Sequence, residues 1–190
     1  VIYRNNADSI DISDMLSRFG LEYTLVGGEN VLEAGVVVRL MHLLQVIQKI
    51  QSKDEDLDLF TLLNYEFMDV DSLDILKISR YASGKKQNFL DVLEEIARNN
   101  SKLSTLKFKE PEKLTDIYQK LTYWNELSHN ITFINFLEQV MEESGFLNWV
   151  LNHAASYEYL NKINSFLSEV KRLNQSNKNL TLSDFLNYIE

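Results

Sequence analysis

Arg4 is an always-charged residue near the start of the chain, and its guanidinium group could pair with carboxylate or phosphate oxygens. Arg4 follows a short apolar stretch that is typical of a strand end. A guanidinium group is planar and always charged, so it can stabilise negative charge that develops on a phosphate. The alternative is an arginine at a strand end that faces water. In this chain alone the second interpretation applies, because the sequence has no Gly-x-x-x-x-Gly-Lys-Ser/Thr loop to hold phosphates.

Other residue types with catalytic or metal-binding chemistry are absent or poorly spaced. The chain has no cysteine, and His42, His129 and His153 are far apart, which is not the spacing of metal ligands. The acidic pairs Glu94-Glu95 and Glu142-Glu143 occupy adjacent helical positions, which point apart and favour a solvated face. We therefore expect no catalytic residue and no metal site within this chain.

The charge of the chain argues against a strong grip on DNA. The formal net charge is −9, and affinity for DNA comes largely from lysine and arginine. Three short basic spots stand among polar residues, which favours solvated faces or loops. They are Lys85-Lys86; Lys102, Lys107 and Lys109; and Lys171-Arg172. We expect weak phosphate contacts at most, from Lys85, Lys86, Lys107 and Lys109.

Aromatic residues offer a second possible contact with nucleic acid. Trp124, Trp149, Tyr157 and Tyr159 could stack on bases. They stand at helical spacing beside leucine and isoleucine, which favours a place in the core.

The apolar pattern of residues 1–28 predicts a strand, a helix and a second strand. The strands are expected at residues 1–3 and 23–26, and Asp8 or Ser9 can cap the helix. A βαβ unit this small cannot bury both faces, so it must belong to a larger sheet or rest on the residues that follow. The helix has apolar residues at helical spacing and a glycine at its end: Ile12, Met15, Leu16, Phe19 and Gly20.

From Glu29 onward every strong signal is helical, so the fold class is predicted to be mainly α. Residues 35–50 are apolar on most faces, which predicts a helix at the centre of the core. Residues 53–58 are expected to form a charged break, and residues 99–109 a mobile polar loop. Further helices are predicted at 59–63; from Asp71 or Ser72 through 81, ended by Ser83-Gly84; at 89–97; from Pro111 through 124; at 131–141, ended near Gly145; at 159–170; and from Thr181 or Ser183 through 189.

The beginning of the chain resembles a segment of a known family of motor proteins. The run Tyr3-Arg4-Asn5-Asn6-Ala7-Asp8-Ser9, then Tyr23 and Gly27-Gly28, is similar to the segment of UvrD/Rep/PcrA-type superfamily 1 DNA helicases that carries motif IV. The family pattern is Tyr-Arg-x-Asn-Ala-x-Ser, a short helix, a Tyr, Gly-Gly and a long helix. Farther along, Glu143-Ser144-Gly145-Phe146 is similar to the family's Ser-Gly-Tyr step, and the helix at 160–167 to its Leu-Glu-Asn-Leu helix.

The resemblance implies a division of the chain and a set of roles. Residues 1–28 would be the motif IV βαβ piece of the second RecA-like motor subdomain, and residues 29–190 a helical 2B-like accessory domain. The chain would be an excised part of a longer protein. Arg4 would contact the γ-phosphate of ATP in that parent, which binds ATP and Mg²⁺, whereas this chain alone binds neither. Gly27 and Gly28 would form a turn, or a hinge, between motor and accessory domain.

The chain also departs from the family pattern. The family has an aromatic pair, an Arg and a Glu-Ile-Lys-Asp run after Gly-Gly, and this chain has Val31-Leu32, Ala34 and Val36-Val37-Val38-Arg39 instead. The family then has Asn before Pro-x-Arg-Gly-Ile-Gly, a hairpin that grips duplex backbone with glycine amides. Here Asn64 is followed by Tyr65-Glu66-Phe67-Met68-Asp69-Val70, without glycine or arginine. Duplex contact through this segment is therefore not expected.

Two hypotheses about function remain open from the sequence. The chain is the accessory region of an ATP-driven DNA helicase, which regulates the motor and contacts DNA or partners, or it is a helical protein-interaction module of a divergent helicase- or nuclease-like protein that has lost DNA contact. The remaining motor subdomains, DNA through the parent, and a protein are the expected partners. We expect no membrane association and a cytoplasmic location, because no apolar run or signal peptide is visible.

Overall fold

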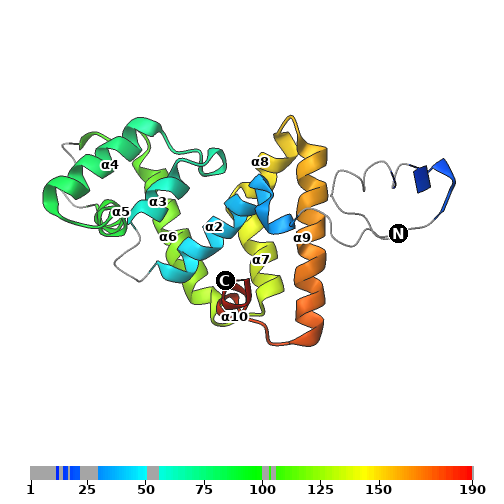
Figure 1. Cartoon of the computed structure of the whole chain (residues 1–190). Coiled ribbons are helices and arrows are strands. Elements are labelled where there is room, and N and C mark those ends of the chain that lie inside the picture. The colour runs from blue at the N-terminus through cyan, green and yellow to red at the C-terminus, as the bar shows by residue number, and fades with distance from the viewer. Residues whose placement is uncertain are drawn as a thin grey trace.

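From residue 30 onward, the described part of the chain is built from helices arranged around one central helix (Figure 1). The computed structural model describes residue 12 and residues 15–16, 18–21, 30–50, 56–99, 103 and 106–189. Every regular element among these residues is helical, so the predicted mainly α fold is confirmed. Within the described residues, no helix is both long and apolar enough to cross a membrane.

The central helix is α2 (Gly35–Lys49), as the apolar pattern predicts. It follows the short 3-10 helix η1 (Val31–Glu33), which Asn30 caps by accepting a hydrogen bond from the Leu32 N–H. Helices on both sides of α2 cover its apolar faces. Among the apolar side chains of α2, Val38 is the exception, since 45% of its surface is exposed. The buried side chains of α2 are Val36, Val37, Leu40, Met41, Leu43, Leu44, Val46 and Ile47.

One side of the molecule is formed by the elements between residues 56 and 128. These are α3 (Asp56–Leu63), η2 (Glu66–Met68), α4 (Ser72–Lys85), α5 (Phe89–Ala97) and α6 (Pro111–Ser128). Pro111 occupies the first turn of α6, as predicted, where its missing N–H leaves no bond unmade. Helix α6 packs along α5 and also touches α2 and α7, so it joins the two sides of the fold.

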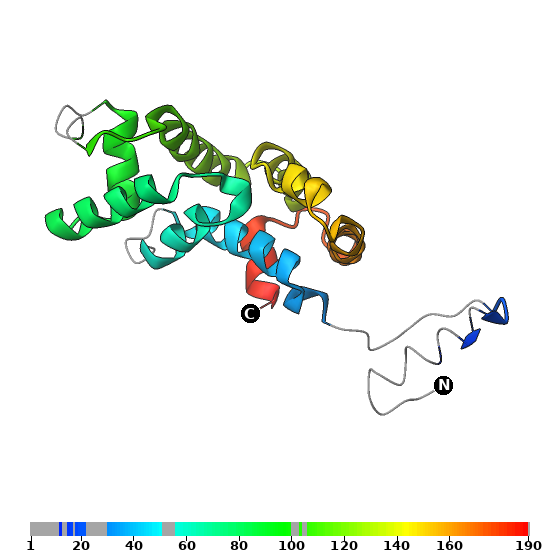
Figure 2. The same ribbon diagram turned by 90° about the horizontal axis from the view of Figure 1, so that it is seen from above.

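The other side is formed by α7 (Phe133–Glu143), α8 (Phe146–Asn152), α9 (Ser156–Ser176) and α10 (Leu182–Ile189). Figure 2 shows α9 nearly end-on, with α2 lying between it and α3 to α5. Phe185 of α10 stacks on Phe133 at 4.3 Å between ring centres and meets Phe166 of α9 edge-on at 6.0 Å. These rings fix the last helix against α7 and α9.

Several predicted boundaries are wrong. Helix α4 continues through Ser83 and Gly84 to Lys85, because Lys86 takes the left-handed conformation (φ 55°) and closes the helix with an N–H bond to the Ala82 carbonyl. Helix α3 begins at Asp56, inside the expected charged break. Helix α8 has no counterpart among the predicted helices.

The predicted loop at 99–109 is anchored in its described part. Leu103 is buried, and Leu106 and Phe108 pack against the core. The Lys107 carbonyl accepts a bond of 2.8 Å from Lys77 Nζ. The expectation of a mobile loop is therefore wrong for residues 106–109, because apolar side chains and polar bonds tie them to α4.

The predicted βαβ unit lies mostly outside the described residues. This holds for both strands, for Arg4 and for Gly27 and Gly28. Ile12, Met15 and Leu16 are helical, in agreement with the predicted helix. Gly20 has φ +65°, and the Leu21 N–H reaches the Leu16 carbonyl at 3.0 Å, so Gly20 ends the helix as expected.

Candidate functional site

The segment after α3 forms one compact turn. Tyr65 leads into η2, whose Phe67 and Met68 are buried, and Asp69 closes the turn in the left-handed region at φ 51°. Aspartate tolerates this region better than most residues with a side chain. The segment compared above with a duplex-gripping hairpin is therefore a 3-10 turn that packs its apolar side chains into the core.

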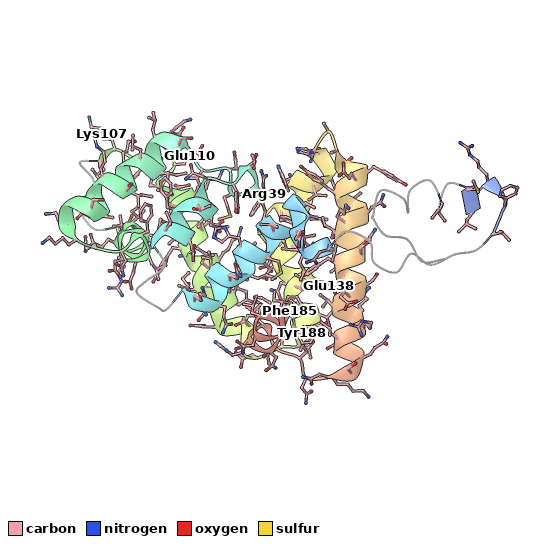
Figure 3. The ribbon with its side chains drawn as sticks, in the orientation of Figure 1. Arg39, Lys107, Glu110, Glu138, Phe185 and Tyr188 are labelled. Atoms are coloured by element: carbon pink, nitrogen blue, oxygen red, sulfur yellow. The ribbon has the colours of Figure 1, made fainter. Side chains whose placement is uncertain are left out.

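Arg39 of α2 holds this turn in place (Figure 3). Its Nη1 atom lies 2.6 Å from Glu66 Oε2. Its guanidinium carbon lies 5.0 Å from the ring centre of Trp149 and 5.4 Å from that of Tyr65. These distances fall within the range of cation–π attraction, so one side chain joins α2, η2 and α8.

A row of rings continues from this arginine along α8 and α9. Trp149 lies 5.5 Å from His153, and His153 stacks on Tyr159 at 4.5 Å between ring centres. On the other side, the His42 Nδ1 atom and the Tyr65 hydroxyl are hydrogen-bonded at 3.0 Å. Burial lowers the pKa of His42 and raises the pKa of Tyr65. Both groups are therefore neutral parts of the packing near neutral pH.

Carboxylates of the chain itself lie at the N-terminus of α4. Asp71 caps the helix by accepting from the Leu73 N–H at 2.9 Å, and its pKa is lowered by a hydrogen bond from Lys109. Asp74 is 1% exposed and accepts from the backbone N–H groups of Lys109 and Glu110, and from Lys77 Nζ at 2.7 Å. A helix N-terminus attracts anions, and here the protein supplies them.

A cleft of about 510 Å³ lies between η2, α6 and α8. Trp124 is buried beside it and donates its indole N–H to Glu143 Oε2 at 2.8 Å. The charged residues that line the cleft are Glu66, Asp69, Lys113, Asp116, Lys120 and Glu143. Lys113 is bonded to Asp69, and Lys120 Nζ lies 2.9 Å from Asp116 Oδ2, so both ammonium groups already have partners.

The four lysines predicted to touch phosphate do not form one surface. Lys85 and Lys86 are exposed at the C-terminal end of α4. Lys109 lies at the other end, with Nζ 2.8 Å from Asp71 Oδ2, so roughly 20 Å of helix separates the two spots. Lys107 is exposed near α4, away from Arg39 (Figure 3). Lys102 lies outside the described residues.

The aromatic residues are mostly structural, as predicted. Trp124 is 1% exposed, and Trp149 and Tyr159 pack against the core. The prediction is wrong for Tyr157, which is 80% exposed. Tyr157 stands two positions before Tyr159, so it points away from the face of α9 that packs inward. Among the described residues, no group of histidine and acidic side chains is arranged to hold a metal ion.

Comparison with known proteins shows a distant similarity to a helicase. No protein-family model matches the chain. The chain is 22% identical over 189 residues to the ATP-dependent DNA helicase PcrA of Bacillus subtilis. The matched region is 98% of this chain and 24% of that protein, so the chain spans about a quarter of its relative's length. This similarity indicates a relationship to UvrD/PcrA-like helicases.

Proposed function

We propose that this chain is the accessory region of an ATP-dependent DNA helicase of the UvrD/PcrA type. Residues 1–28 then belong to the second RecA-like motor subdomain, and residues 29–190 form a 2B-like domain. The observation that carries the proposal is a similarity to a helicase that spans nearly the whole chain but only a quarter of the relative. The all-helical architecture of the described residues between 30 and 189 supports it, since an ATP-binding motor would need a parallel sheet.

The proposed chemistry belongs to the longer protein. Arg4 would contact the γ-phosphate of ATP there, and Gly27 and Gly28 would join the motor to the accessory domain. ATP and Mg²⁺ would be held by residues beyond this chain, because the sequence has no phosphate-binding loop. Within the chain, the role of residues 29–190 would be to steer or restrain the motor on DNA.

Removal of the accessory domain from the complete helicase tests this role. Residues 30–189 are replaced by a short Gly/Ser linker, and ATP turnover and strand separation are measured on a partial duplex. DNA-stimulated ATP turnover should persist, because the motor is intact, while the rate of strand separation should change. An unchanged rate of strand separation would contradict an accessory role.

A second candidate function is supported by the N-terminus of α4. A helix end that grips phosphate needs free N–H groups and no nearby anions. Here Asp69, Asp71 and Asp74 surround that end and are bonded to lysines of the same chain. This arrangement favours a helical protein-interaction module that has lost duplex contact.

A titration of the isolated chain with labelled duplex and single-stranded DNA tests the second candidate. We expect weak binding that decreases steeply with salt, because phosphate contacts release counterions. Replacing Lys85 and Lys86 by alanine should lower the salt slope by about 2, one unit for each contact. Lys178→Ala, at an exposed turn elsewhere, is the control. Tight duplex binding that resists salt would rule out the second candidate.

A further inference from the structure

The cleft between η2, α6 and α8 has the size of a binding site, and it is closed at one end. Its volume of about 510 Å³ falls within the range of about 300–1,000 Å³ that ligand pockets occupy. Gly145 lies in the turn between α7 and α8 with φ +82°, and a Cβ atom there would meet the Phe67 carbonyl oxygen at 3.0 Å. The turn is therefore pressed against η2 and closes that end of the cleft.

The charge of the cleft wall favours a cation. Four carboxylates line it, and three of them are ion-paired: Glu66 with Arg39, Asp69 with Lys113, and Asp116 with Lys120. Glu143 differs from the other carboxylates, because its bonds come from neutral donors. Trp124 Nε1 donates to one oxygen at 2.8 Å, and Gln139 Nε2 donates to the other at 2.9 Å. Among the described residues, no cation pairs with Glu143.

The neutral donors also orient this carboxylate. The Trp124 ring is buried and cannot move freely, so the bond fixes Glu143 at the cleft wall. Beside it, the exposed carboxamides of Asn148 and Asn152 on α8 line the same cleft, and Asn152 Nδ2 donates to Asn148 Oδ1 at 3.0 Å. A fixed carboxylate can pair with a positively charged side chain of a peptide. The neighbouring carboxamides can bond the peptide backbone, which has both N–H donors and C=O acceptors.

We propose that this cleft docks a peptide segment of a protein partner through an arginine or lysine side chain that pairs with Glu143. The inference deepens the second candidate function, because it names the surface and the chemistry of the partner. Nucleic acid fits less well, since the excess of carboxylates repels phosphate. Asn148 Nδ2 and Asn152 Oδ1, which the bond between the two carboxamides leaves over, would bond the backbone on either side of the basic residue.

The indole N–H of Trp124 provides a direct readout, because it is bonded to Glu143. The intact chain, labelled with ¹⁵N, is titrated with an acetylated and amidated Gly-Gly-Arg-Gly-Gly peptide, and the indole signals of Trp124 and Trp149 are followed. The Trp124 signal should move as the guanidinium reaches the carboxylate. A peptide with citrulline in place of arginine, which has the same shape without the charge, should leave it in place.

Two glutamates on α7 provide a matched pair of variants. Glu143→Gln removes the charge and keeps one acceptor oxygen, which can still accept from the Trp124 indole N–H. It should weaken binding of the arginine peptide about fivefold, as expected for an exposed ion pair. Glu138→Gln makes the same change in net charge at an exposed position outside the cleft (Figure 3). This variant should bind the arginine peptide with the same affinity as the wild type.

The proposal is overturned if the arginine peptide leaves the Trp124 signal unmoved, if citrulline moves it equally, or if both variants weaken binding alike. The comparison of the two peptides needs only the wild-type chain, so it holds even if Glu143→Gln fails to fold. Displacement of the peptide by a DNA oligonucleotide would assign the cleft to nucleic acid. Titration of the same samples with duplex DNA measures DNA binding, which does not depend on Glu143. A negative result with the peptide would therefore overturn the docking proposal and leave the proposed helicase relationship standing.

Discussion

At the scale of single residues, Arg39 connects three elements that are far apart in the chain. It stands on the central helix, pairs with Glu66 in η2 and lies over the Trp149 ring of α8. About two-thirds of its side chain is withdrawn from water. A lysine could provide the charge but not the flat surface that lies on two aromatic rings.

We expect Arg39→Ala to lower the free energy of unfolding by about 1–2 kcal/mol, from the lost ion pair and ring contacts. Arg39→Lys should cost less, because it keeps the charge. Arg80→Ala, at an exposed arginine of α4, serves as the control and should stay near the wild type. Urea unfolding followed by circular dichroism measures all three, and an Arg39→Ala variant as stable as the control would contradict this role.

His42 gives the stability a pH dependence of known sign. Burial lowers its pKa in the folded chain from the ordinary value of 6.5. The unfolded chain therefore takes up a proton first, so the free energy of unfolding is highest above pH 6.5 and falls as the pH drops toward the lower, folded pKa.

His42→Gln should reduce this acid-side loss of stability, while His129→Gln, at an exposed histidine, should not. The measurement is a series of urea unfolding curves between about pH 7.5 and pH 5, the range in which histidine titrates. A slope against pH that is the same in both variants would show that His42 does not control it.

At the scale of elements, the last helix depends on a reciprocal cap. The Asp184 N–H donates to Thr181 Oγ1 at 3.2 Å, and the Thr181 N–H and hydroxyl both donate to Asp184 Oδ2. These bonds lower the pKa of Asp184. The cap fixes the start of α10 and thereby the position of Phe185 between Phe133 and Phe166.

The pattern of the sequence allowed either Thr181 or Ser183 as the cap, and a pair of variants decides between them. Thr181→Ala should destabilise the chain by about 1 kcal/mol, the usual cost of a lost helix cap. Ser183→Ala should have little effect. Thermal unfolding compares the two, and a larger loss in Ser183→Ala would contradict the assignment.

Most helices could be predicted from the sequence, because the cap and the apolar face of each helix lie within the helix or directly beside it. Pro111, Asp71 and Thr181 act within one turn of their helices, and the apolar face of α2 is visible in a single window of sequence. The end of α4 was missed because Lys86 takes a conformation usually left to glycine, while Gly84 stays helical. Helix α8 was missed because it has seven residues, too few to show a period.

The site was less predictable, because its contacts cross long stretches of chain. Asp74 is buried by partners 35 and 36 positions away, and nothing near it in sequence marks it as buried. Lys109 stands in a polar run that resembles a free basic loop, yet it is paired with Asp71. The absence of glycine after Asn64 was visible in the sequence, but the lysines that pair with the carboxylates Asp69 and Asp71 were not.

At the scale of the whole molecule, the described residues form a helical body without phosphate-binding machinery. The excess of negative charge opposes binding to DNA in general. The carboxylates at the N-terminus of α4 oppose it at one particular place. Both facts support the proposed accessory role.

DNA-stimulated ATP hydrolysis tests the central claim most directly. It is measured for this chain alone, for the complete protein, and for the complete protein with Arg4→Ala, with Arg18→Ala as a matched arginine control in the same segment. We expect no turnover by the chain alone, turnover that rises with DNA in the complete protein, a large loss in Arg4→Ala, and little change in Arg18→Ala. Turnover by the isolated chain, or a complete protein that does not hydrolyse ATP with DNA present, would contradict the account.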